Sequence, residues 1–208
     1  MGRKRISQFF LLFMMSFSGW SQTPSDSIMV HFLYGSKPSG EFRNEEEKWF
    51  GGKLGGHVGI ELNPGQVADF IPSGDFHIFG RKSPKHGRFV LRSADSFWSM
   101  FGADKDSART LTVVIPLEQK TRLQLDSVVA EYLQTSPYDY AFFGMRCAAA
   151  AYDLLGKSGV LEERTIHGTC WRYFYPRKLR RKLIKEAEER GWRIVRSEGT
   201  HRRIWDHH

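Results

Sequence analysis

The chain has 208 residues, enough for one domain with a sizeable core, and a formal net charge of +8 at pH 7. It holds two cysteines, so at most one disulfide bond can form. The sequence shows no nucleic-acid-binding module and no internal repeat, and after the first 20 or so residues no segment is apolar enough to span a membrane. These features exclude nucleic-acid-binding modules, repeat proteins and multispanning membrane proteins.

The first residues have the order of a secretory signal peptide. A basic start is followed by an almost unbroken apolar run at residues 9–17 and then by small or polar residues. The apolar run is too short to cross ~30 Å of hydrocarbon as a helix. We therefore expect residues 1–22 to be cleaved, the protein to be exported to the periplasm or beyond, and residues 23–208 to form a single domain. Loss of three basic residues from a net charge of +8 leaves the mature chain at +5.

Apolar, aromatic and β-branched residues, together with turn signals, predict strands in the first half of the chain. Residues 28–34 form the first strand, and residues 36–56 form a long loop of the kind that often shapes a binding site. The turn signal at residues 63–65 predicts a hairpin between its flanking strands. The remaining predicted strands are residues 57–62, 66–71, 76–81, 88–92 and 110–115.

The second half of the chain is predicted to be mainly helical. Residues 122–133 place leucine and valine near helical spacing. A second helix runs from Cys147 through four alanines, with Gly156 well placed to end it. A basic amphipathic helix at 176–190 and a last strand at 192–195 complete the pattern. Strands followed by helices indicate an α+β fold.

Cys147 is the first candidate for chemistry because it lies where a helix begins. Free backbone N–H groups and the positive end of the helix dipole lower the pKa of a thiol placed there. Arg146 adds positive charge, and the same N–H groups can donate to an oxyanion during acyl transfer. In an oxidising compartment Cys147 can instead pair with Cys170, and closing that loop would stabilise the fold by ~3–4 kcal/mol.

His57, directly after Gly56 at the head of a predicted strand, is a candidate general base. Side chains alternate along a strand, so His57 shares one face with Gly59 and Glu61. The other face is apolar and belongs in the core: Val58, Ile60 and Leu62. The face with His57 therefore meets another element, for which the cysteine helix is the candidate. Gly59 indicates a close approach at this face.

The order of these residues resembles that of the permuted NlpC/P60, or papain-like, superfamily. This group includes YiiX-type proteins and lecithin:retinol acyltransferase-like enzymes. The resemblance rests on the stretch from His57 to Leu62, on Val67-Ala68-Asp69 and on Cys147 at the start of a helix. The histidine comes before the cysteine, as in the permuted group, whereas ordinary papain-like enzymes have the reverse order. The resemblance implies a small antiparallel sheet packed on the cysteine helix.

The same resemblance implies a cysteine hydrolase that uses no cofactor and no metal. Cys147 would be the nucleophile, His57 the base, and Asp69 the residue that orients the imidazole. The first substrate class would be an amide in a cell-wall peptide, and the second an ester or thioester of a lipid. Arg146 departs from the family pattern, and the plain alanines after Cys147 argue against retinoid or phospholipid acyl transfer.

The hairpin register decides whether Asp69 can serve as the third residue. If only Pro64 and Gly65 formed the loop, Asp69 would pair with Ile60 and face the core. An odd-length loop or a bulge would place Asp69 opposite Gly59, on the face of His57 and within side-chain reach. Without either feature, Glu61 becomes the candidate.

Four further residues are expected at the substrate: Gly56, Glu61, Tyr138 and Arg146. Tyr138 and its neighbour Tyr140 can lend a hydroxyl to the oxyanion site or simply pack, as buried tyrosines usually do. The histidines outside His57 show no metal-ligand spacing.

Two partners and one alternative function remain open. The basic helix that includes Arg177 and Arg190 is expected either to be a solvated face or to contact anionic lipid or a glycan. No nucleic-acid partner is expected. The alternative to an enzyme is a non-catalytic exported binding or structural domain in which Cys147 and Cys170 form a disulfide.

Overall fold

The computed structural model describes residues 27–48, 55–101 and 107–207. The predicted signal peptide at residues 1–22 lies outside the described residues, as does part of the predicted loop at 36–56. Within the described ranges, no helix is long and apolar enough to cross a membrane.

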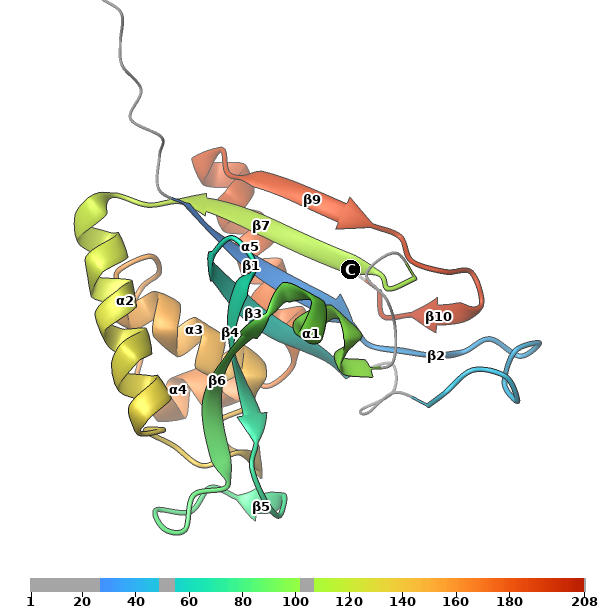
Figure 1. Cartoon of the computed structure of the whole chain (residues 1–208), viewed down its shortest axis with the longest axis horizontal. Helices are drawn as coiled ribbons and strands as arrows, with labels where there is room; N and C mark the ends of the chain where they lie inside the picture. The colour runs from blue at the N-terminus through green and yellow to red at the C-terminus, as the bar shows by residue number, and fades with distance from the viewer. Residues whose placement is uncertain (1–26, 49–54, 102–106, 208) are drawn as a thin grey trace, which may run out of the picture.

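A six-stranded antiparallel sheet organises the described chain, with strand order β6-β4-β3-β1-β7-β9 (Figure 1). Each of these strands overlaps a segment that the sequence predicts as a strand, because the apolar and β-branched residues are already present in the local sequence. The bounds are β1 Ser27–Tyr34, β3 Gly56–Asn63, β4 Gln66–Pro72, β6 Gly87–Ser93, β7 Thr110–Pro116 and β9 Arg193–Ser197.

Two small sheets flank the large one. β2 (Ser36–Pro38) pairs with β10 (Arg203–Trp205), and β5 (His77–Phe79) pairs in parallel with β8 (Ala141–Phe143). Of these four short strands the sequence predicts only β5, as part of a longer strand at 76–81. Together with five helices, the described chain has the predicted α+β class.

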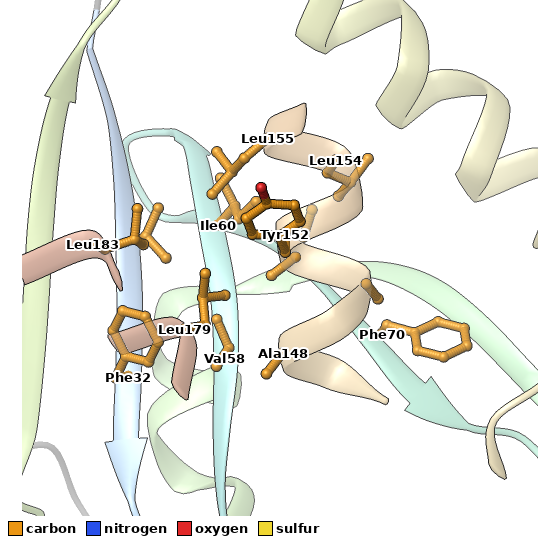
Figure 2. Packing of buried hydrophobic residues seen from close by; sticks show 14 of the residues in the cluster. Phe32, Val58, Ile60, Phe70, Ala148, Tyr152, Leu154, Leu155, Leu179 and Leu183 are labelled. Carbon is orange, nitrogen blue, oxygen red and sulfur yellow. The ribbon is translucent and has the colours of Figure 1, made fainter. Parts of the chain in front are cut away.

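The cysteine helix, α3 (Cys147–Lys157), packs on one face of the large sheet. Figure 2 shows Ala148 and Leu155 of α3 beside Val58 and Ile60 of β3. The four alanines of the first turn are at most 5% exposed, so their small side chains allow the helix to lie close to the sheet. The structure therefore confirms that the apolar side of β3 faces the core.

Three helices surround α3 on this side of the sheet. α5 (Pro176–Arg190) lies along β1, with Leu179 and Leu183 next to Phe32 (Figure 2). α2 (Gln119–Gln134) and α4 (Ile166–Arg172) also pack against α3. The sequence predicts α2 and α5 but not α4, a short helix capped by Thr165, whose side chain accepts a hydrogen bond from the Gly168 N–H.

The opposite face of the sheet is covered by α1 (Ala94–Trp98), followed by a 3-10 turn at Ser99–Phe101. Phe97 of α1 is fully buried and lies against His57. A Cβ on Gly59 would come within 2.6 Å of the Phe97 ring. The predicted close approach at Gly59 is therefore present, but the element is α1 and not the cysteine helix, because α3 packs on the opposite side of β3.

The end of α3 also differs from the prediction. The helix continues through Gly156, and the chain turns instead at Gly159, which has a φ of 81°. Gly156 is needed for a different reason: a Cβ there would lie 3.3 Å from the Cα of Glu163, in the segment between α3 and α4.

An arginine of α5 is buried against the residues after β10. Arg180 is 1% exposed, donates to the Asp206 carboxylate at 2.8 Å, and lies 3.7 Å from the centre of the Tyr34 ring. This contact attaches residues 203–207 to the middle of the fold.

Candidate active site

Cys147, His57 and Asp69 meet where β3 and α3 begin. The His57 Nε2 atom lies 2.6 Å from Asp69 Oδ2, and both side chains are buried. The thiol of Cys147 is hydrogen-bonded to His57. Since Nε2 is bonded to Asp69, Nδ1 is the ring nitrogen left for the thiol. The three groups therefore form a relay in the order carboxylate, imidazole, thiol.

A bulge in the hairpin makes this relay possible. Asn63 pairs with Gln66 across a two-residue turn, but the register shifts between Glu61 and Asn63, and Gly59 lies opposite Asp69. Asp69 consequently shares a face with His57, as the sequence argument requires for its proposed role. The Glu61 Oε1 atom accepts a hydrogen bond from the Gly65 N–H at 2.8 Å and so helps to hold the turn.

Charge around the thiol favours the thiolate. Burial raises the pKa of Cys147. The charge of the His57 imidazolium, its hydrogen bond to the thiol and the charge of Arg146 lower the pKa by more, so the pKa of Cys147 is lowered overall. A hydrogen bond from the Val58 N–H acts in the same direction.

The pKa of the His57 imidazole shifts in the opposite direction. Burial lowers the pKa of His57, whereas the Cys147 thiolate and the hydrogen bond to Asp69 raise it, to about 10. The two directions together favour a thiolate beside an imidazolium, which is the reactive state of a nucleophilic cysteine.

Arg92, which the sequence argument missed, completes the support of Asp69. Its Nε donates to Asp69 Oδ1 at 3.0 Å, so each carboxylate oxygen of Asp69 has its own cationic partner. Arg92 lies on β6 opposite Val67, diagonal to Asp69. Only the order of strands in the sheet reveals this proximity, and no local signal in the sequence marks it.

A cavity of about 350 Å³ opens beside the thiol. Arg92 and Arg146 are its charged wall residues, and Tyr140 its hydroxyl. The other wall is largely apolar and comprises Gly56, Ile71, Pro72, Met100 and Pro176. Two of the four predicted substrate residues, Gly56 and Arg146, thus lie at the cavity.

The hydroxyl of Tyr140 lies at the start of the cysteine helix. The Cys147 N–H and the side chain of Arg146 lie near it, and both lower its pKa. Burial and the nearby thiolate raise the pKa of Tyr140, so it stays a neutral phenol. A carbonyl oxygen that approaches the thiol meets the same Cys147 N–H, which makes this the position for an oxyanion.

The guanidinium of Arg146 is held by aromatic rings. It lies 4.8 Å from the centre of Phe174 and also packs on Phe142 and Tyr175. Its Nε is buried without a hydrogen-bond partner. These contacts fix a positive charge next to the thiolate.

The other two predicted substrate residues lie away from this cavity. Tyr138 packs on Phe70 and its hydroxyl donates to Asp153 at 3.5 Å, so it has the packing role rather than the oxyanion role. Glu61 pairs with His31 at 2.7 Å on the face covered by α1. Asp69, and not Glu61, therefore contacts His57.

Both cysteines are free thiols, so the disulfide expected under the non-catalytic alternative is not formed. Cys147 is bonded to His57, whereas Cys170 is half-buried on α4 at a different hollow. Burial raises the pKa of Cys170 to about 11. Cys170 therefore has none of the activation found at Cys147.

Two further histidines are paired with carboxylates, His31 with Glu61 and His77 with Asp139. Neither pair is hydrogen-bonded to a cysteine in the described part of the chain. In the part of the chain that the structure describes, no group of three or more His, Cys, Asp or Glu side chains is placed to hold a metal ion.

Comparison with known proteins finds no match for this chain among protein-family models, curated proteins or solved structures.

Proposed function

We propose that this chain is an exported thiol hydrolase of the permuted papain-like type. The observation that carries the proposal is the buried Cys147 thiol at a helix start, bonded to a histidine that Asp69 holds at 2.6 Å. The order His57, Asp69, Cys147 along the chain and the packing of α3 on an antiparallel sheet also support it.

The reaction would proceed through a thioester. The Cys147 thiolate attacks the substrate carbonyl carbon, and the oxyanion accepts from the Cys147 N–H and, after its hydroxyl turns, from Tyr140. The His57 imidazolium gives its proton to the leaving group, which departs as the carbon–heteroatom bond breaks. His57 then takes a proton from water as that water attacks the thioester, and the acid and the thiolate are released.

The first substrate class is an amide in a cell-wall peptide, which rests on the family resemblance. The second is an ester or thioester of a lipid, which the apolar cavity wall around Ile71 and Met100 favours. Either substrate would be met outside the cytoplasm, in keeping with the expected signal peptide.

Turnover of two substrate sets tests the proposal. The protein would be incubated with purified cell-wall peptides and with nitrophenyl esters of increasing chain length, and products followed by mass spectrometry and absorbance. We expect one set to be hydrolysed by the wild type and by Cys170→Ala, and Cys147→Ala to reduce the rate at least about a thousandfold. Hydrolysis that survives in Cys147→Ala, or a wild type inert to both sets while its thiol is unreactive, would contradict the proposal.

A further inference from the structure

Large apolar side chains are exposed on and around β5, the strand at one end of the fold in Figure 1, and on β8 and α4. Phe79 is 68% exposed, Trp171 64% and Ile78 63%. These side chains come from β5, β8, α4 and their flanks, three segments that are far apart in the sequence. We call this set the aromatic surface: Phe76, Ile78, Phe79, Phe142, Phe143, Ile166 and Trp171.

Ring contacts join the five aromatic residues of the aromatic surface into one patch. Phe143 stacks on Phe79 with ring centres 5.5 Å apart, and packs on Phe142 and Trp171. Phe142 in turn contacts Phe76. Single exposed apolar side chains are ordinary on protein surfaces, but a continuous patch rimmed by polar groups marks a site of interaction.

The rim of this patch is strongly basic. Residues 73–88 contain four exposed basic side chains and a single acidic one; the basic residues are Arg81, Lys82, Lys85 and Arg88. A hollow of about 680 Å³ is lined by both kinds of residue: Phe143, Ile166 and Trp171 are apolar, and Arg81, Lys82 and Lys85 are basic. The buried Asp139 is its acidic lining residue. The surface therefore offers apolar contact and positive charge at the same place.

The aromatic surface also adjoins the catalytic cavity. Phe76 lies against Tyr140, with ring centres 5.8 Å apart, and Phe142 lies against the guanidinium of Arg146. Tyr140 and Arg146 both line the cavity beside Cys147. A partner bound at the aromatic surface would thus lie next to the entrance of the cavity.

We infer that the aromatic surface docks the protein on a bilayer that contains anionic phospholipid. Phenylalanine and isoleucine side chains lack polar groups and so suit acyl chains, and Trp171 suits the interface between headgroup and hydrocarbon. The arginines and lysines of the rim match the phosphate groups of the headgroups. A glycan is the weaker match, because sugar binding depends on directional hydrogen bonds that this apolar patch does not offer.

This surface is distinct from the basic helix singled out in the sequence. On α5, Arg180 is buried against Asp206, and Lys182 and Arg190 pair with Glu186. Much of the positive charge of α5 is therefore neutralised within the protein. In the part of the chain that the structure describes, the side chains of Arg81, Lys82 and Lys85 form no ion pair, and Arg81 contacts Asp139 only through its backbone N–H.

Vesicle flotation tests the inference. Protein purified after export would be floated with vesicles of phosphatidylcholine, either alone or with about a third phosphatidylglycerol. The wild type and all variants would carry the same N-terminus, so that only the substitutions differ. We expect binding to the anionic vesicles at least about tenfold above the neutral ones, and its loss as salt screens the rim charges. The double variant Phe79→Ser with Trp171→Ser should lose binding about tenfold, and Lys82→Glu with Lys85→Glu should lose the preference for anionic lipid.

Matched controls lie on α2, where Leu123 is 63% exposed and Lys120 is exposed. Leu123→Ser and Lys120→Glu should float like the wild type, and all variants should keep the wild-type circular dichroism and melting temperature. Cys147→Ala should also float normally, so that loss of docking and loss of catalysis are distinguishable. Three outcomes would overturn the inference. The wild type could fail to bind vesicles, the control variants could lose as much vesicle binding as the test variants, or the protein could bind isolated cell-wall glycan instead of vesicles.

Discussion

Asp69 uses both of its carboxylate oxygens, one for His57 and one for Arg92. It is 2% exposed, so neither bond competes with bulk water. The imidazole is also fixed from the side by the Phe97 ring, whose centre lies 5.7 Å away. Both the tautomer and the orientation of His57 are therefore set before a substrate arrives.

Replacing this carboxylate separates its role from that of Glu61. In a hydrolase of the proposed kind, Asp69→Asn should reduce kcat by about 10²–10⁴-fold, because an amide neither stabilises the imidazolium nor secures the tautomer. Glu61→Gln is the matched control, since Glu61 contacts His31 and not His57, and it should keep near wild-type activity. Steady-state kinetics on the hydrolysed substrate would measure both, and equal losses in the two variants would contradict the assignment.

The coupled thiol and imidazole predict a particular pH dependence. The pKa of Cys147 is lowered and that of His57 is raised to about 10, so the ion pair persists between the two. Iodoacetamide should label Cys147 already near pH 6, because the lowered pKa of Cys147 increases its thiolate fraction, and Cys170, with its pKa near 11, should stay unlabelled. Peptide mass mapping of the unreduced protein from about pH 5 to 9 measures this.

His57→Ala is the diagnostic variant for that experiment. It removes the imidazolium that lowers the pKa of the thiol, so labelling of Cys147 should move to higher pH. Catalysis should also fall on the alkaline side as His57 loses its proton near pH 10, while alkylation continues there. Labelling that begins only after a reductant is added would show a disulfide and remove the catalytic interpretation.

At the scale of elements, α1 and β3 lie unusually close. A Cβ on Gly59 would meet Val67 at 2.5 Å and Phe97 at 2.6 Å. Gly59→Ala should therefore destabilise the fold by about 1–3 kcal/mol, because Phe97 must move from its buried position. Gly40→Ala is the control, since nothing lies within 4 Å of a Cβ there. Urea unfolding followed by circular dichroism compares them, and equal midpoints would contradict this packing.

The predictable elements are those whose pattern is local. The alternation in β1, β3 and β7 and the apolar spacing of α2 can be found in the sequence because each element buries its own stripe. β8 and β10 are three-residue strands defined by a partner distant in the sequence, so no local pattern marks them.

The residues of the candidate site also differ in how far the local sequence reveals them. Cys147 and His57 stand out by residue type and by the helix or glycine beside them. Arg92 reaches Asp69 only through the order of strands in the sheet. Tyr138 and Tyr140 are two residues apart, and only the packing of Tyr138 on Phe70 and the position of Tyr140 in the cavity beside Cys147 separate their roles.

At the scale of the whole molecule, the contact between Arg180 and Asp206 joins α5 to the residues after β10. Asp206→Ala leaves the arginine buried without its carboxylate, which should destabilise the protein by about 3–5 kcal/mol. Glu198→Ala is the matched control, because its pair with Arg109 is exposed on the Glu198 side, and it should change stability by less than about 1 kcal/mol. Chemical unfolding of both variants measures the difference, and similar losses would contradict the structural role of Asp206.

The order of the site residues along the chain has a consequence for biosynthesis. The hairpin with His57 and Asp69 is made first, and Cys147 follows only after β6, β7 and α2. In an unfolded chain a cysteine has its ordinary pKa of about 8.5 and is mostly protonated at neutral pH. Activation requires α3 to dock on the sheet, so if the expected signal peptide directs export, a newly made chain would cross the membrane with an unreactive thiol. The nucleophile would form only in the folded protein, at its destination.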